Sequence, residues 1–132
     1  MPFSKVKVRI VTVYNYLVGL LPVKLANRLV WVDLQMDWSI SIYEGTNFLN
    51  LKPTSVLKNP VISRRDVTDA VAVFVADPFM VRVQDNWLMF FEVFNQKQNK
   101  GQIAFARSKD GYNWNYQHII LSEDFHLLSL CI

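Results

Sequence analysis

The sequence of 132 residues contains one cysteine, Cys131. A single cysteine excludes an internal disulfide framework and any metal site built on several thiolates, and it suits a reducing compartment. His126 stands near Glu123 and Asp124, but this group lacks the second histidine that a metal site of that kind would use. We therefore expect neither a metal nor another cofactor.

Long hydrophobic runs are also missing. The apolar stretch 10–23 is short for a membrane span, contains Asn15 and Pro22, and has basic residues on both sides. No small-residue cleavage site follows it cleanly, which disfavours a signal peptide. The sequence therefore predicts a soluble, cytoplasmic protein with no transmembrane segment.

The basic residues are not gathered into one continuous stretch of the sequence. The formal net charge of +3 comes from 14 Lys and Arg scattered among 11 Asp and Glu, with a mild basic excess near the N-terminus. Nucleic-acid binding proteins usually gather their basic residues on one face, often with exposed aromatic side chains between them. We therefore expect no nucleic-acid partner.

Apolar residues, in contrast, are abundant. Hydrophobic residues make up 52% of the chain and aromatic residues 14%, against 19% charged residues, so extensive disorder is excluded. The length fits one domain with a modest core. We expect an N-terminal segment of residues 1–37 followed by a mainly β domain of residues 38–132.

The second half of the chain has the strongest secondary-structure pattern. Short apolar segments alternate with turn-forming residues such as Gln84-Asp85-Asn86 and the tract NQKQNKG. The pattern predicts a four-stranded antiparallel β-meander between Asp77 and Leu121. Its strands are expected at Phe79–Val83, Trp87–Val93, Gln102–Arg107 and Tyr116–Leu121.

The first half is less uniform. The segment KVKVRIV alternates as a strand would, whereas YNYLVGLL and VKLANRLVWV fit short helices separated at Pro22. A further strand is predicted at Trp38–Tyr43, and a long irregular connection that follows the surface is expected after Gly45. In this connection, Arg64, Arg65 and Asp66 are expected to lie in a solvated loop rather than to bind a phosphate.

The segment WLMFFEV carries apolar side chains on both faces of its strand. Met89 and Phe91 point to one face and Leu88 and Phe90 to the other, so both faces need to be covered. A blade of a β-propeller is sandwiched between two neighbours and fits this pattern. A central strand of a small α+β sheet, with the N-terminal segment packed on one side, is the alternative.

The motifs AVFVADPFMVRV, NWLMFFE and GQIAFARSKDGYNW carry a family resemblance. Together they resemble the first blade of the five-bladed propellers shared by glycoside hydrolase families 43, 32 and 68. With WSISIYEG and NPVISRRDVTD they resemble more closely still the N-terminal domain of the glucosamine inositolphosphorylceramide transferase group. The resemblance covers residues 38–126, and it implies carbohydrate or glycolipid as the partner.

The resemblance also implies a role for Asp77. In the glycosidase propellers the matching aspartate opens the innermost strand and acts as general base or nucleophile. Such chemistry requires a second carboxyl group, which lies on a later blade in those enzymes. We therefore expect an incomplete five-bladed propeller that is not catalytic by itself, and the departure from the family pattern after Leu127 is typical of a truncated gene.

Two more residues are candidates for substrate binding. Glu92 ends the second strand and could reach the funnel of a propeller, and His126 has a sugar-binding role by the same resemblance. The tryptophans Trp38, Trp87 and Trp114 could stack on a sugar, but their places in the strand pattern predict that most of them belong to the core.

Three hypotheses about function follow. The leading one is a fragment of a carbohydrate-active propeller related to glycoside hydrolases and glycolipid glycosyltransferases. The second is a non-catalytic interaction module that docks or self-associates through its apolar blade. The third, a hydrolase assembled from several copies, requires activity that depends on Asp77.

Overall fold

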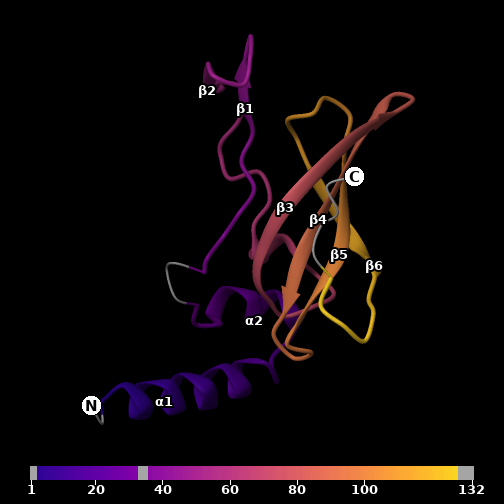
Figure 1. Cartoon of the computed structure of the whole chain (residues 1–132). Coiled ribbons are helices and arrows are strands. Elements are labelled where there is room, and N and C mark those ends of the chain that lie inside the picture. Colours follow the sequence, from indigo (N-terminus) through magenta and orange to yellow (C-terminus); the bar gives the residue numbers. More distant parts are fainter. Residues whose placement is uncertain (1–2, 33–35, 128–132) are drawn as a thin grey trace.

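The computed structural model describes residues 3–32 and 36–127, with side chains from residue 11 onward. Cys131 and the departure from the family pattern after Leu127 lie outside the described residues. The fold is mainly β, with one four-stranded and one two-stranded antiparallel sheet preceded by helices (Figure 1). In chain order the elements are α1 (Phe3–Val18), α2 (Val23–Leu29), β1 (Tyr43–Gly45), β2 (Leu51–Pro53), the 3-10 helix η1 (Arg64–Asp66), β3 (Ala72–Val83), β4 (Asn86–Asn95), β5 (Lys100–Ser108) and β6 (Asn115–Leu121).

The predicted meander is confirmed. Strands β3, β4, β5 and β6 lie side by side in chain order, and each pair is antiparallel. The central pair β4 and β5 keeps one register from Trp87 opposite Ser108 to Asn95 opposite Lys100. The sheet is twisted and open, and no closed sheet is found among the described strands (Figure 1).

The main core lies on one face of this sheet. Met89, Phe91 and Val93 of β4 are fully buried there, as the alternation of the strand predicts. Ile62 and Val67, from the connection before β3, cover them from the other side. On the opposite face, Leu88 and Phe90 are only half-buried, so both faces of the central strand carry apolar side chains.

The predicted strand Trp38–Tyr43 is wrong for most of its length. Only Tyr43 belongs to a strand, and Ile40 forms an isolated bridge to Ile62. The Asn59 side chain explains the difference, because its amide oxygen accepts from the N–H of Ile42 and its amide nitrogen donates to the Ile42 carbonyl. A side chain thus satisfies the backbone groups that a strand neighbour would have paired.

The connection after Gly45 was expected to be irregular and to follow the surface, and this is wrong in part. Strands β1 and β2 form a hairpin whose residues are all exposed and which projects from one end of the molecule (Figure 1). Later in the same connection, η1 begins with a capping box in which the side chains of Ser63 and Asp66 bond each other's backbone N–H groups.

Arg64 does not lie in a solvated loop. It is buried, and its Nε donates to Asp37 Oδ1 at 3.0 Å while Nη1 donates to the carbonyls of Asn27 and Val30. The guanidinium group therefore joins the C-terminal end of α2 to η1. Several donors in a fixed fork suit arginine to such a role.

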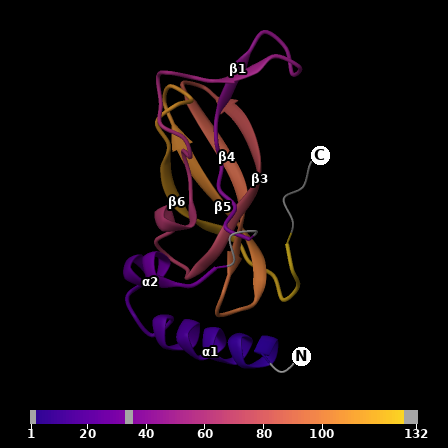
Figure 2. The ribbon, with the colours of Figure 1, turned by 90° about the vertical axis from the view of Figure 1, so that its left-hand side faces the viewer.

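The N-terminal segment is helical, and α1 continues through KVKVRIV despite its alternating pattern. Asn27 of α2 holds this segment to the sheet, because its side chain bonds the carbonyls of Val67 and Ala70 and the N–H of Ala72. A second buried cluster of Val18, Ala26, Val30 and Val71 completes the junction. In both views α1 lies at the end of the molecule opposite β1 and β2 (Figures 1 and 2).

Candidate functional site

Asp77 lies within β3 and not at its start, because β3 begins at Ala72 rather than at the predicted Phe79. The register with β4 shifts between Ala76, which faces Glu92, and Phe79, which faces Phe90, so Asp77 and Pro78 form a bulge. Proline has no N–H to contribute to the ladder and fits such a position. Asp77 is exposed and has a φ of 50°, a left-handed conformation that aspartate tolerates better than most residues.

A hollow of about 340 Å³ lies next to this bulge. Its lining consists of residues 38–41 on one side and Val75, Ala76, Asp77 and Pro78 on the other. Trp38, expected in the core, is 52% exposed and packs on Phe74 with 5.5 Å between ring centroids. The hollow therefore combines a carboxylate, an indole and the two serines Ser39 and Ser41.

Glu92 and His126 lie next to one another on the opposite face of the sheet from the main core. Nε2 of His126 is 3.4 Å from Oε1 of Glu92, and Nδ1 of His126 accepts a hydrogen bond from the Gly101 N–H. An accepting Nδ1 leaves the proton of a neutral imidazole on Nε2, the nitrogen that lies beside the carboxyl group. Glu92 is 2% exposed, and its Oε1 has no hydrogen-bond partner among the described residues.

Burial dominates the electrostatics of Glu92. Loss of water raises the pKa of its carboxyl group above the ordinary 4.5, the nearby His126 lowers it, and the charge of Asp77 raises it. Glu92 therefore senses the charges of both other candidate residues. Glu92 itself is not open to a ligand.

A row of aromatic rings links the two places. Phe74 packs on Trp38 and also on Phe94, whose ring centroid is 5.2 Å away, and Phe94 lies 5.7 Å from the imidazole of His126. The structure thus brings Glu92 and His126 together and connects them through Phe74 and Phe94 to the hollow beside Asp77.

Gly101 is a residue that sequence reasoning missed. A Cβ atom there would lie 2.3 Å from the carbonyl oxygen of Leu127 and 2.6 Å from Oε1 of Glu92. The Leu127 N–H also donates to the Gly101 carbonyl, so glycine allows residues 126 and 127 to lie against β5. The sequence carries no signal for this contact, because NKGQ reads as an ordinary turn.

A metal is not suggested by the arrangement. Within residues 3–32 and 36–127, no group of three His, Cys, Asp or Glu residues has the geometry to hold a metal ion. The backbone carbonyl of Glu123 accepts from the amine of Lys100. The hollow can form hydrogen bonds through Asp77 and the two serines and can stack on a ring through Trp38, whereas the carboxyl group of Glu92 is buried.

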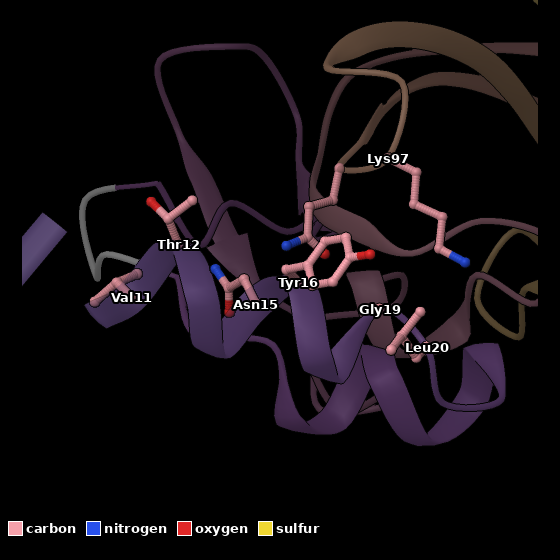
Figure 3. A pocket seen from close by; sticks show the side chains of 8 residues that line it. Val11, Thr12, Asn15, Tyr16, Gly19, Leu20 and Lys97 are labelled. Carbon is pink, nitrogen blue, oxygen red and sulfur yellow. The ribbon is translucent and has the colours of Figure 1, made fainter. Parts of the chain in front are cut away.

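A second and larger hollow lies between α1 and the turn after β4 (Figure 3). Its volume is about 580 Å³, and it is lined by Val11, Thr12, Asn15, Tyr16, Gly19 and Leu20 together with Gln96 and Lys97. It contains none of the residues predicted to bind a substrate. The described helices include none that is long and apolar enough to cross a membrane.

The sequence profile described as glucosamine inositolphosphorylceramide transferase 1, N-terminal, matches residues 31–131. That match includes the hollow, the whole four-stranded sheet and His126. The chain belongs to this family. The match begins after α2, so the two N-terminal helices precede the part that this transferase family shares.

Comparison with individual proteins agrees with the family. Glucosamine inositolphosphorylceramide transferase 1 of Oryza sativa subsp. indica is 32% identical over 110 residues, as is its counterpart from subsp. japonica. The transferase 1 of Arabidopsis thaliana is 31% identical over 110 residues. The matches cover 72% of this chain but only 14 to 15% of the relatives' length. No solved structure matches the chain.

Proposed function

We propose that the chain is a carbohydrate-binding part of a glycolipid-modifying protein, in which residues 38–132 bind a sugar headgroup at the hollow beside Asp77. The names of the relatives point to glucosamine and an inositol phosphate lipid as the chemistry in question. Both carry several hydroxyl groups, which need hydrogen-bond acceptors and donors arranged around a shallow surface.

The observation that carries the proposal is that Asp77 and Trp38 line the same hollow. A carboxylate accepts hydrogen bonds from two neighbouring sugar hydroxyls, and an exposed indole offers a flat apolar face to the C–H groups of a sugar ring. Asp77 is held in the left-handed conformation at the bulge, and such backbone strain is characteristic of binding sites. Ser39 and Ser41 add hydroxyl groups at the same hollow.

Catalysis by this chain alone is not part of the proposal. Glycoside cleavage uses two carboxyl groups on opposite sides of the bond. Glu92 is 2% exposed and is therefore not open to a glycoside as the second carboxyl group, which supports binding rather than hydrolysis as the role of this chain. By resemblance to the propeller glycosidases, we propose that the four-stranded sheet is one blade and that further blades would supply the second carboxyl group.

A titration followed by two-dimensional NMR tests the proposal. Glucosamine and myo-inositol phosphate, added separately to the labelled chain, are expected to shift the Trp38 indole N–H and the amides around Asp77. Asp77→Ala and Trp38→Ala should each weaken binding about tenfold or more, since each removes one of the two contacts.

Matched controls lie elsewhere on the surface. Asp85 is an exposed turn residue, and Trp31 is 44% exposed, close to the 52% of Trp38. Asp85→Ala and Trp31→Ala should leave the affinity unchanged. Absence of any shift at millimolar ligand, or equal binding by the Asp77 variant and the parent chain, would refute the assignment.

An interaction module remains the second candidate, and the free face of the sheet favours it. Phe90 and Phe105 stack there with 6.2 Å between centroids, and Phe105 also meets His118 edge-on at 5.0 Å. Phe79 on β3, which is paired with Phe90, is exposed as well. Sedimentation velocity distinguishes the two: self-association that is lost in Phe79→Glu supports docking through the sheet, whereas a monomer at all concentrations argues against it.

A further inference from the structure

The first 32 residues differ in charge from the rest of the chain. They contain five basic residues and no acidic residue, and the remaining 100 contain nine basic and 11 acidic residues. The formal charge is therefore +5 in the N-terminal helical segment and −2 in everything that follows. The basic residues of the segment are Lys5, Lys7, Arg9, Lys24 and Arg28.

The same segment exposes many large apolar side chains. Val13 and Leu17 of α1 are 59% and 56% exposed, and Leu20 in the following turn is 69% exposed. Leu25 and Leu29 of α2 are exposed too. Large apolar side chains gathered on one element at one end of a molecule indicate an interaction surface.

Hydrogen bonds to residues 29–31 fix the position of α1, which carries part of this exposed apolar surface. The Tyr14 hydroxyl donates to the Leu29 carbonyl, and the Asn15 side chain bonds both the N–H and the carbonyl of Trp31. Val18, on the same side of α1 as Asn15, is buried. One side of α1 therefore faces the body of the protein, whereas Val13 and Leu17 are exposed on the helix and Leu20 is exposed at the rim of the hollow beside Lys97.

We propose that α1 and α2 dock the chain on an anionic membrane surface, with the helices lying in the plane of the interface. Apolar side chains of an interfacial helix enter the boundary between headgroups and acyl chains, and basic residues beside them attract anionic lipids. A protein partner or a second copy would satisfy the apolar surface, but a second copy would bring two segments of charge +5 together. The charge thus favours an anionic lipid surface.

Lys97 adds a cation at the edge of this surface. Together with Asn15 and Tyr16 it lines the hollow between α1 and the turn after β4, where its side chain extends beside the helix (Figure 3). No ion pair of Lys97 is found in the described part of the chain. An ammonium group with amide and hydroxyl neighbours suits the phosphate of a lipid headgroup.

The docking surface is distinct from the sugar site. The transferase family profile matches residues 31–131, so α1 and α2 lie outside it and Lys97 lies within it. The inference stands without the proposed sugar binding, and Asp77→Ala should leave membrane binding unchanged.

Vesicle flotation tests the inference with the full chain. Vesicles of phosphatidylcholine mixed with phosphatidylserine are expected to carry the protein, and vesicles of phosphatidylcholine alone to carry about tenfold less. The double variant Leu17→Glu/Leu20→Glu should reduce binding about tenfold or more, and Lys24→Glu/Arg28→Glu should reduce it and flatten its dependence on salt. Leu17→Ser/Leu20→Ser serves as a milder version should the glutamates disturb folding.

The chain offers a matched control at its other end. Phe48 and Leu49 in the β1–β2 hairpin are 82% and 84% exposed, yet the hairpin lies opposite α1 (Figure 2). Phe48→Glu/Leu49→Glu should leave vesicle binding unchanged. No flotation with either vesicle, equal flotation with both, or a loss caused only by the hairpin variant would overturn the inference. So would a dimer broken by Leu17→Glu/Leu20→Glu in a chain that does not bind vesicles.

Discussion

The imidazole of His126 lies against the buried carboxyl group of Glu92, with 3.4 Å between Nε2 and Oε1. Its other nitrogen accepts from the Gly101 N–H, so one side chain connects the segment after β6 with both β4 and β5. The segment is held further by a bond from Gln102 to the Ser122 hydroxyl at 2.5 Å. Stability measurements can separate these contacts.

Glu92 should make the free energy of unfolding fall as pH rises. Burial raises the pKa of Glu92 in the folded state above the ordinary 4.5 of an unfolded chain, so the folded state holds the proton more tightly. The stabilisation is therefore complete at pH values below 4.5 and is lost as pH rises through the raised pKa. Chemical denaturation at a series of pH values should show this slope, and Glu92→Gln should remove it.

Glu123→Gln is the control for this effect, because Glu123 is exposed. It should leave the slope unchanged. If Glu92→Gln and the parent chain depend on pH in the same way, the carboxyl group of Glu92 is not desolvated as the structure implies.

Gly101→Ala should lower the free energy of unfolding by about 1–3 kcal/mol, the usual cost of forcing an atom into a packed site. The new Cβ would lie 2.3 Å from the Leu127 carbonyl oxygen and 2.9 Å from Cε1 of His126. The imidazole resonances of His126 should move at the same time. Gly19→Ala, where the closest atoms are 3.3 Å away, should change stability by less than about 1 kcal/mol. Equal stabilities for the two variants would contradict the packing at Gly101.

Asn27→Ala should cost about 3 kcal/mol of unfolding free energy. The substitution deletes three buried hydrogen bonds and leaves the backbone groups of Val67, Ala70 and Ala72 without partners. Asn15 makes two bonds to Trp31 at a partly exposed position, so Asn15→Ala should cost about 1 kcal/mol. Urea denaturation of both variants measures the difference, and a mild effect at Asn27 would refute its anchoring role.

Asp110→Asn should weaken the loss of stability in acid. The N–H groups of Asn113 and Tyr112, the Asn113 side chain and the Ser108 hydroxyl all contact its carboxylate, and they hold the pKa of Asp110 well below its ordinary 3.8. A depressed pKa stabilises the folded state above pH 3.8, and this contribution disappears as pH falls further. Acid unfolding followed by fluorescence should be shallower in the variant, and more so at low salt because the group is exposed.

The four strands of the sheet could be predicted from local pattern, because alternation and turn residues act between neighbours in the chain. Local pattern could not show that the strand expected at Trp38–Tyr43 does not form. The backbone groups of Ile42 bond the side chain of Asn59, which lies 17 residues away in the chain, instead of a neighbouring strand. The segment KVKVRIV alternates as a strand would, yet it forms part of α1.

The sequence predicted which residues belong to the candidate site, but it did not predict how their side chains are arranged. Asp77 and His126 could be singled out by resemblance and Glu92 by its place at the end of a strand, but the burial of the Glu92 side chain could not be predicted. The exposure of Trp38 depends on how residues 38–41 run beside β3. Arg64 was expected in solvent and is buried because Asp37 and two carbonyls meet it there.

The sequence by itself determined the mainly β character, the order and direction of the meander, and the concentration of basic residues before position 33, since composition and short-range periodicity carry that information. Only the tertiary structure decided that His126 meets Glu92, that Asp77 at its bulge and Trp38 line one hollow, and that Val13 and Leu17 of α1 stay exposed. Each of these depends on contacts between residues far apart in the chain, which no local pattern encodes.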